Sequence, residues 1–154
     1  SNDIDLLITH PLIKTYDELS NSKTNYLHKL VTALEKAKII VDGLTYKDYV
    51  NKYMGFCRLT KKSPIRRIDI RYMPMTSYYP ALLYFTGSGD FNKRMRGIAK
   101  EMDYKLNEYG IFKITIKTTK DEEKKIYKRK KVNSEKDIFD LLNMEYLAPE
   151  KRIN

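Results

Sequence analysis

The hydrophobic pattern of the chain changes its period near Pro74, and this change limits what the chain can fold into. Before Pro74, the stretch RRIDIRY alternates apolar and charged residues, which is typical of a strand with one buried face. After Pro74, the stretch SYYPALLYFTG has helical spacing and predicts a helix over about 77–85. We therefore expect a sheet-rich part over residues 1–74 and a second part over residues 75–154.

The first part has the pattern of a sheet with one packed helix. Apolar residues at strand-like spacing predict strands over residues 3–9, 39–41, 49–59 and 65–73. Between the first two strands, residues 24–38 have apolar side chains on one helical face and Lys and Glu on the other. This amphipathic helix is expected to pack on the sheet.

The second part combines helices with a small antiparallel sheet. A second helix is predicted over residues 90–102, after the turn TGSG. The stretches NEYGIF and KITIKTT are expected to be short strands, and the basic run KKIYKRKK a hairpin or its return strand. Near the end, Ser134 is a good N-cap with Asp137 three residues later, so a helix is predicted there. The predicted fold class is α+β.

Composition and charge narrow the class of function. The chain has 154 residues, 42% of them hydrophobic, which is enough for a real core. Its net charge of +10 favours a polyanionic partner, with nucleic acid ahead of an anionic membrane surface, because no long apolar segment accompanies the charge. We find no signal sequence or membrane span, so a soluble intracellular protein is expected. With one cysteine and two histidines, an internal disulfide is excluded and a Cys/His zinc site nearly so.

The positive charge is concentrated in one segment. Residues 113–131 contain nine Lys or Arg against three Asp or Glu, which gives +6 of the total of +10. A solvated hairpin and a phosphate-contacting segment both fit this pattern. The sequence does not decide between them.

Three acids stand among the residues of the predicted strands. On an extended strand Asp3 and Asp5 share one face, about 7 Å apart, and Asp69 lies on a later strand. If the two strands are neighbours, the three carboxylates can hold two Mg²⁺ ions about 3.5–4 Å apart, an arrangement suited to phosphoryl transfer. The alternatives are a solvated edge strand and ion pairs with Arg67 and Arg71.

Seven segments, in the same order along the chain, resemble family X DNA polymerases, most closely the DNA polymerase beta and lambda group. They are DIDLLITHP, YMGFCRL, RRIDIRYMP, YYPALLYFTGS, FNKRMR, LNEYGI and VNSEKDIFDLLNMEY. The resemblance implies that residues 1–74 form the carboxy-terminal part of a nucleotidyltransferase-type palm. Residues 75–154 would form the thumb- or fingers-type subdomain that closes on the nascent base pair.

The resemblance also implies a role for particular residues. Asp3, Asp5 and Asp69 would be the catalytic acids that bind two Mg²⁺ ions, for which Mn²⁺ can substitute. Arg71 and Glu108 would form a conformational switch. The residues expected at the incoming nucleotide are Ser1, Asn2, Tyr84, Phe85, Gly87 and Asn92. The residues expected at DNA are Arg67, Lys93, Arg96, Asn107 and Tyr109. Asn2 departs from the family, which usually has glycine there.

The function implied is that of a DNA-directed DNA polymerase, a nucleotidyltransferase that adds a dNTP to a primer 3′-hydroxyl. We expect short-gap filling in repair, such as base excision repair, by a monomer that binds gapped or primed DNA and no membrane. Its location would be nuclear in a eukaryotic cell, and a viral source stays open. One alternative is a template-independent nucleotidyltransferase. The other is a non-catalytic DNA-binding fragment, because the family's triphosphate-holding strand and helix are expected upstream of Ser1.

Overall fold

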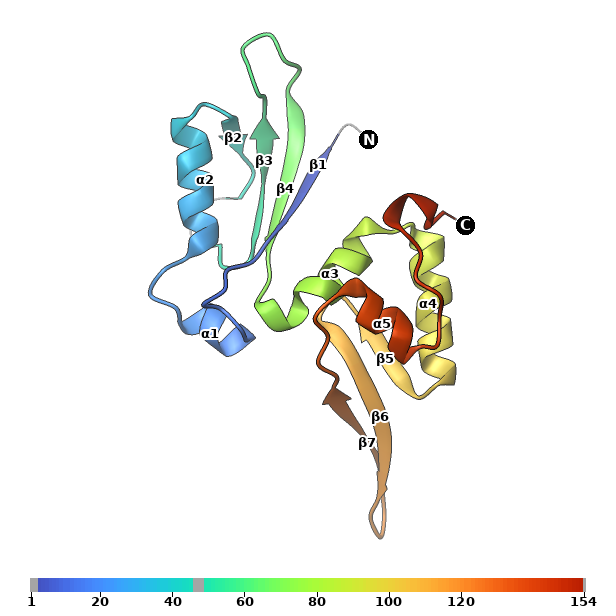
Figure 1. Cartoon of the computed structure of the whole chain (residues 1–154). Coiled ribbons are helices and arrows are strands. Elements are labelled where there is room, and N and C mark those ends of the chain that lie inside the picture. The colour runs from blue at the N-terminus through green and yellow to red at the C-terminus, as the bar shows by residue number, and fades with distance from the viewer. Residues whose placement is uncertain (1–2, 46–48, 154) are drawn as a thin grey trace. The chain divides into compact units, whose positions relative to one another are not determined.

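The computed structural model describes residues 3–45 and 49–153, which fall into two compact units. The first unit is Ser1–Met75 and the second is Thr76–Asn154. Figure 1 shows a sheet and an adjacent helix in the first, and helices with a long hairpin in the second. Among the described residues, every helix is too short or too polar to span a lipid bilayer.

The first unit is a four-stranded mixed sheet with the strand order β1-β4-β3-β2. Strand β1 pairs with β4 in parallel, and the other pairings are antiparallel. The elements are β1 (Ile4–Ile8), α1 (Tyr16–Asn21), α2 (Tyr26–Lys36), β2 (Ile40–Gly43), β3 (Lys52–Cys57) and β4 (Arg66–Tyr72). The four strands and the long helix expected from the sequence are confirmed, with ends that differ by a few residues.

Helix α2 provides the core of this unit. Its buried Leu27 and Val31 pack with Ile68 and Ile70 of β4. Because side chains alternate along a strand, the face of β4 that carries Asp69 is the one turned away from this core. Helix α1 was not predicted from the sequence. It is only six residues long and begins at an N-cap, where the side chain of Thr15 accepts a hydrogen bond from the backbone N–H of Glu18.

The second unit packs helices against a three-stranded antiparallel sheet with the order β5-β6-β7. Its core includes Phe91 and Met95 of α4, Ile111 of β6 and Phe139 of α5. The elements are α3 (Met75–Thr86), α4 (Gly89–Glu101), β5 (Tyr104–Asn107), β6 (Gly110–Thr118), β7 (Glu123–Arg129), α5 (Glu135–Leu141) and the 3₁₀ helix η1 (Pro149–Lys151).

One strand of this sheet was assigned wrongly from the sequence. NEYGIF is not a strand, because Asn107 ends β5, Glu108 and Tyr109 form the turn, and Gly110 begins β6. The physical reason is that the side-chain oxygen of Asn107 accepts hydrogen bonds from the backbone N–H groups of Tyr109 and Gly110. Such a local bond stabilises a turn rather than a strand. The return strand expected in the basic run is confirmed as β7.

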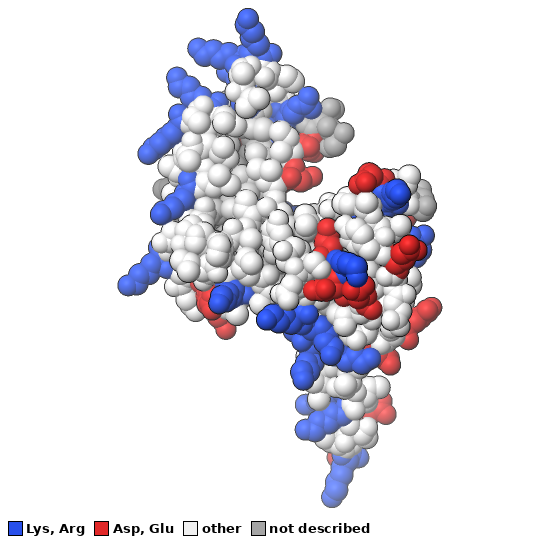
Figure 2. Space-filling view, viewed as in Figure 1, with Lys and Arg blue, Asp and Glu red and all other residues white. Residues whose placement is uncertain are grey.

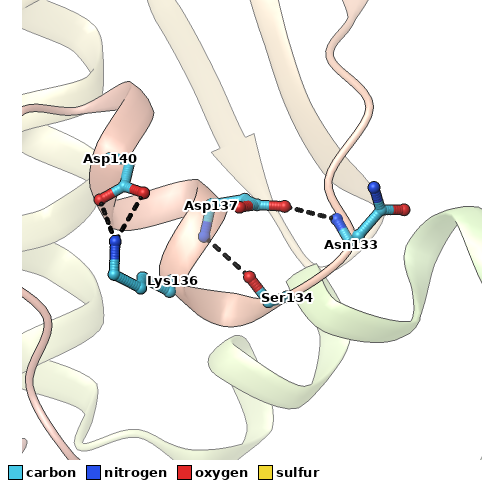
Figure 3. A network of polar contacts seen from close by, with 5 residues as sticks. All are labelled: Asn133, Ser134, Lys136, Asp137 and Asp140. Carbon is cyan, nitrogen blue, oxygen red and sulfur yellow. Dashed lines mark hydrogen bonds and ion pairs between the residues drawn. The ribbon is translucent and has the colours of Figure 1, made fainter.

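The predicted N-cap of the last helix is confirmed. The Ser134 hydroxyl accepts a hydrogen bond from the backbone N–H of Asp137, and the Asp137 carboxylate accepts one from the backbone N–H of Asn133 (Figure 3). One turn further on, Lys136 pairs with Asp140 at 2.9 Å. These contacts fix where α5 begins.

Gly55 is required by close packing within the first unit. A β-carbon at this position would lie 2.8 Å from the carbonyl oxygen of Asp42 and 2.7 Å from the hydroxyl of Tyr53. Since the backbone cannot move aside cheaply, we expect Gly55→Ala to destabilise the unit by about 1–3 kcal/mol. Urea-induced unfolding followed by circular dichroism would measure the loss. Gly97→Ala is the matched control, because a β-carbon at Gly97 has no neighbour within 4 Å. Equal stabilities of the two variants would contradict the prediction.

Candidate active site

The central strands of the first unit bring two of the predicted acids together. In the parallel pairing of β1 and β4, Asp5 lies directly opposite Asp69. Directly opposed residues of neighbouring strands share a face, so the two carboxylates lie on the same side of the sheet. Asp3 stands two residues before Asp5, immediately ahead of β1. This face of the sheet therefore carries acidic side chains on two neighbouring strands, β1 and β4.

A cation already lies at this face. The Arg67 guanidinium donates a hydrogen bond to Asp69 Oδ1 at 2.9 Å, with both side chains about one-third exposed. The same guanidinium lies 5.8 Å from the centre of the Phe56 ring, and its buried Nε has no hydrogen-bond partner. The ion pair expected as an alternative to metal binding thus exists in the structure. It holds one oxygen of the Asp69 carboxylate in place.

The acids fit a divalent metal in donor type and in shared face. Carboxylate oxygens are the ligands that Mg²⁺ prefers, and Asp5 and Asp69 present them from adjacent strands. Within the described part of the chain, however, no three His, Cys, Asp or Glu side chains are gathered closely enough to hold a metal ion. The backbone therefore places Asp5 and Asp69 side by side, while the acidic side chains are not gathered around one point.

In the second unit, four predicted site residues line one small pocket. Tyr84 and Asn92 are expected at the nucleotide, and Arg96 and Asn107 at DNA. The Asn92 side-chain amide donates a hydrogen bond to the carbonyl oxygen of Tyr84 at 2.7 Å, which links α4 to α3. The apolar walls of the pocket are Pro80, Leu83, Met95 and Leu106. Lys93 lies on the exposed surface of α4.

The turn between α3 and α4 is held from the far end of the chain. Gly87 has φ of +73°, a conformation that glycine adopts readily, and the side chain of Ser88 caps α4 by accepting a hydrogen bond from Phe91 N–H. The Ser88 backbone N–H donates to the carbonyl oxygen of Arg152 at 2.9 Å. Phe85, expected at the nucleotide sugar, is 37% exposed beside this turn. Arg152 was missed from the sequence, since no local pattern marks a contact across 64 residues.

The turn at Tyr109 is fixed by a similar set of contacts. Its carbonyl oxygen accepts hydrogen bonds from the buried Ser77 hydroxyl at 2.6 Å and from Arg129 Nη1 at 2.5 Å. The Tyr109 side chain is left 46% exposed. Ser77 and Arg129 were also missed, because they lie 32 and 20 residues from Tyr109 in the sequence.

The remaining predicted residues are placed as follows. Arg71 lies on β4 of the first unit, and Glu108 in the turn between β5 and β6 of the second. Ser1 and Asn2 lie outside the described residues.

Cys57, which the sequence did not associate with the site, is buried, and burial raises the pKa of its thiol.

This mixed sheet with paired acids, followed by a helical unit with a small sheet, is the architecture of a nucleotidyltransferase palm and thumb. Comparison with known families agrees with it. Residues 1–75 match the DNA polymerase beta palm, and residues 81–153 match the DNA polymerase beta thumb. The chain belongs to family X of the DNA polymerases.

Two of the relatives match nearly the whole chain, and a third matches about half of it. DNA polymerase lambda of Rattus norvegicus is 30% identical over 154 residues, which is 97% of this chain and 26% of the relative. DNA polymerase lambda of Arabidopsis thaliana is 27% identical over 97% of this chain and 28% of its own length. The DNA-directed DNA/RNA polymerase mu of Homo sapiens is 37% identical over 56% of this chain and 16% of its own length. The chain thus spans about a quarter of the length of its lambda relatives.

Proposed function

We propose that this chain provides the catalytic acids and the nucleotide-selecting surface of a DNA-directed DNA polymerase. The reaction transfers a nucleotide from a dNTP to a primer 3′-hydroxyl and releases pyrophosphate. The observation that carries the proposal is the placement of Asp5 directly opposite Asp69 in a palm-type sheet. Residues 1–74 are assigned to the palm and residues 75–154 to the thumb.

The acids of the first unit are assigned to two Mg²⁺ ions, with Mn²⁺ as a substitute. Asp3 and Asp5 would be ligands of both ions, and Asp69 of the catalytic one, nearest the primer 3′-hydroxyl. When bound, the metals lower the pKa of the attacking hydroxyl and neutralise charge on the triphosphate. Arg67 then has two roles. Its guanidinium orients the Asp69 carboxylate, as the 2.9 Å hydrogen bond indicates. The family resemblance assigns it a contact with the primer phosphate as well.

The second unit is assigned to nucleotide and template selection. Tyr84, Phe85 and Gly87 would form a wall at the sugar that leaves no room for a 2′-hydroxyl, so deoxynucleotides are selected by exclusion. Asn92 would contact the minor-groove edge of the base. Its hydrogen bond to the Tyr84 carbonyl supports this role, because the bond fixes the position of the side-chain amide. Ser1 and Asn2 are assigned to the same nucleotide.

The remaining site residues are assigned to contacts with the template strand and to closure of the thumb. Lys93, Arg96, Asn107 and Tyr109 would contact the template strand, and the three groups that fix the Tyr109 turn support a rigid contact there. Arg71 is proposed to leave an active-site aspartate and pair with Glu108 when the thumb closes. The setting proposed is short-gap repair in the nucleus, by a monomer.

The test is single-nucleotide addition to a duplex with a one-base gap, in Mg²⁺, by the protein expressed from its complete reading frame. Addition of the template-matched dNTP alone is the expected result. Addition that ignores the template base would instead indicate a template-independent nucleotidyltransferase. DNA binding without release of pyrophosphate would indicate a non-catalytic DNA-binding protein.

A further inference from the structure

The hairpin of β6 and β7 has an exposed surface with no assigned contact to metal, nucleotide, primer or template. Every residue from 115 to 128 is exposed, so this part of the hairpin extends beyond the core of the second unit. Figure 2 shows Lys and Arg side chains along the projecting hairpin, with few Asp or Glu. Residues 113–131, which cover most of this hairpin and the two lysines after it, carry +6 of the chain's net charge of +10.

The strand register gathers four lysines on one face. Lys117 lies directly opposite Lys124, and Lys113 directly opposite Lys128. Because alternate residues of a strand share a face, both pairs lie on the same side of the hairpin, and we call these four residues the lysine face. Between the pairs, Thr115 lies opposite Ile126. The other side of the hairpin carries Phe112, Ile114, Ile116, Lys125, Tyr127 and Arg129.

The lysine face works against the stability of the hairpin. Like charges placed directly opposite each other on neighbouring strands are destabilising. In the part of the chain that the structure describes, no ion pair involves a lysine of this face; the pairs Arg67–Asp69, Lys136–Asp140 and Arg152–Glu135 lie elsewhere. A structural role would favour alternating charges here. Two like-charged pairs without an acidic partner favour a surface that binds an anionic partner.

The spacing of the lysine face suits a nucleic-acid backbone. The two pairs stand about 13–14 Å apart along the strands, and the members of each pair about 5 Å apart across them. Lysine ammonium groups act as point charges toward phosphates and need no particular base sequence. Only Ile126 is apolar on this face, which is too little to anchor in a lipid surface.

The hairpin is also continuous with the turn assigned to the template. Gly110 directly follows Tyr109, and Arg129 of the return strand donates a hydrogen bond to the Tyr109 carbonyl. At its base, Lys113 Nζ is held by the Met102 carbonyl at 3.1 Å and lies 4.6 Å from the centre of the Tyr104 ring. These contacts tie the lysine face to the part of the unit that is proposed to meet DNA.

We propose that the lysine face binds backbone phosphates of duplex DNA outside the nascent base pair. The proposal rests on the proposed function for the choice of DNA as the polyanion. Lys117 and Lys124 supply the two outermost contacts, and Lys113 and Lys128 lie nearer the body of the unit.

The test is the salt dependence of binding to a labelled gapped duplex, measured by fluorescence anisotropy on the full protein. We expect the double variant Lys117→Gln/Lys124→Gln to bind about tenfold more weakly at about 0.1 M salt. The slope of log K against log salt should fall in magnitude by about 2, roughly one for each lost phosphate contact. The matched control is Lys120→Gln/Lys125→Gln, which removes the same charge from the turn and the opposite face of the hairpin. Its slope should change by less than about 1.

Equal losses of DNA affinity in the two double variants would overturn the proposal, because the loss would then come from the lower overall charge. Unchanged DNA affinity in both double variants would also overturn the proposal. A lower melting temperature of Lys117→Gln/Lys124→Gln would overturn it as well, since neutralising like-charge pairs should not destabilise the hairpin. Vesicles of anionic lipid that bind as strongly as duplex DNA, with the same dependence on the lysine face, would identify a membrane partner instead.

The two proposals fail in different ways. The lysine variants should add nucleotides at the unchanged rate in single turnovers at saturating DNA. If no variant or parent protein adds nucleotides, the proposed function fails, and the binding slopes still decide whether the lysine face contacts DNA.

Discussion

Replacing Asp69 by alanine is expected to lower the rate of nucleotide addition at least about 10³-fold and to leave DNA affinity nearly unchanged. The lost carboxylate would be a ligand of the catalytic metal, whose charge stabilisation amounts to several kcal/mol of the barrier, at about 1.4 kcal/mol per tenfold in rate. The proposed binding to DNA would rely on the basic surfaces and not on this acid. Single-turnover addition to a one-base gap, together with anisotropy on the same DNA, measures both quantities.

Two further variants make this prediction specific. Asp69→Asn keeps an oxygen that can accept the hydrogen bond from Arg67, so its loss of activity would report the missing charge and not a released guanidinium. Asp42→Ala removes an exposed carboxylate from β2, at the other end of the same sheet, and should add nucleotides at the parent rate. Parent-like addition by both Asp69 variants would refute the assignment of Asp69 as a catalytic acid.

The sequence predicted the strands of the first unit well because each buries one face. Alternation in RRIDIRY told which side chains of β4 are buried, and the buried Ile68 and Ile70 confirm it. It did not tell that β1 and β4 run parallel, since alternation is the same in either direction. The direct opposition of Asp5 and Asp69 therefore needed the structure.

The wrong strand assignment of NEYGIF, the missed helix α1 and the missed contacts each have a physical cause. Tyr109 and Ile111 favour strands, and this preference concealed the turn that Asn107 stabilises with its side chain. Helix α1 is too short for a hydrophobic period to show. The contacts that fix the turn between α3 and α4 and the turn at Tyr109 come from Arg152, Ser77 and Arg129, which are distant from those turns in sequence. No pattern within a window of a dozen residues can reveal them.

Arg152 combines several of these distant contacts in one buried side chain. Its Nη1 pairs with Glu135 Oε2 at 2.6 Å, and its Nε donates to the Leu147 carbonyl at 2.9 Å. The guanidinium also lies 5.3 Å from the centre of the Phe139 ring and 5.6 Å from that of Tyr146. The side chain is fully buried, so the charge depends on these partners for its compensation.

We expect Arg152→Met to destabilise the second unit by about 3–5 kcal/mol, because it leaves the largely buried Glu135 carboxylate without its partner. Urea-induced unfolding followed by circular dichroism, with hydrogen exchange in α4 and α5, would measure the loss and locate it. The neighbouring exposed Lys151→Met is the control and should change stability by less than about 0.5 kcal/mol.

The double variant Arg152→Met/Glu135→Leu separates the ion pair from packing. Replacing both buried partners by apolar residues is often neutral, so this variant should recover most of the stability lost in Arg152→Met. If it were less stable than the single variant, the cost would come from lost packing around the guanidinium and not from an orphaned charge. Because the Arg152 carbonyl accepts the hydrogen bond from Ser88, recovery of stability should be accompanied by recovered discrimination between dNTP and rNTP at the adjoining turn.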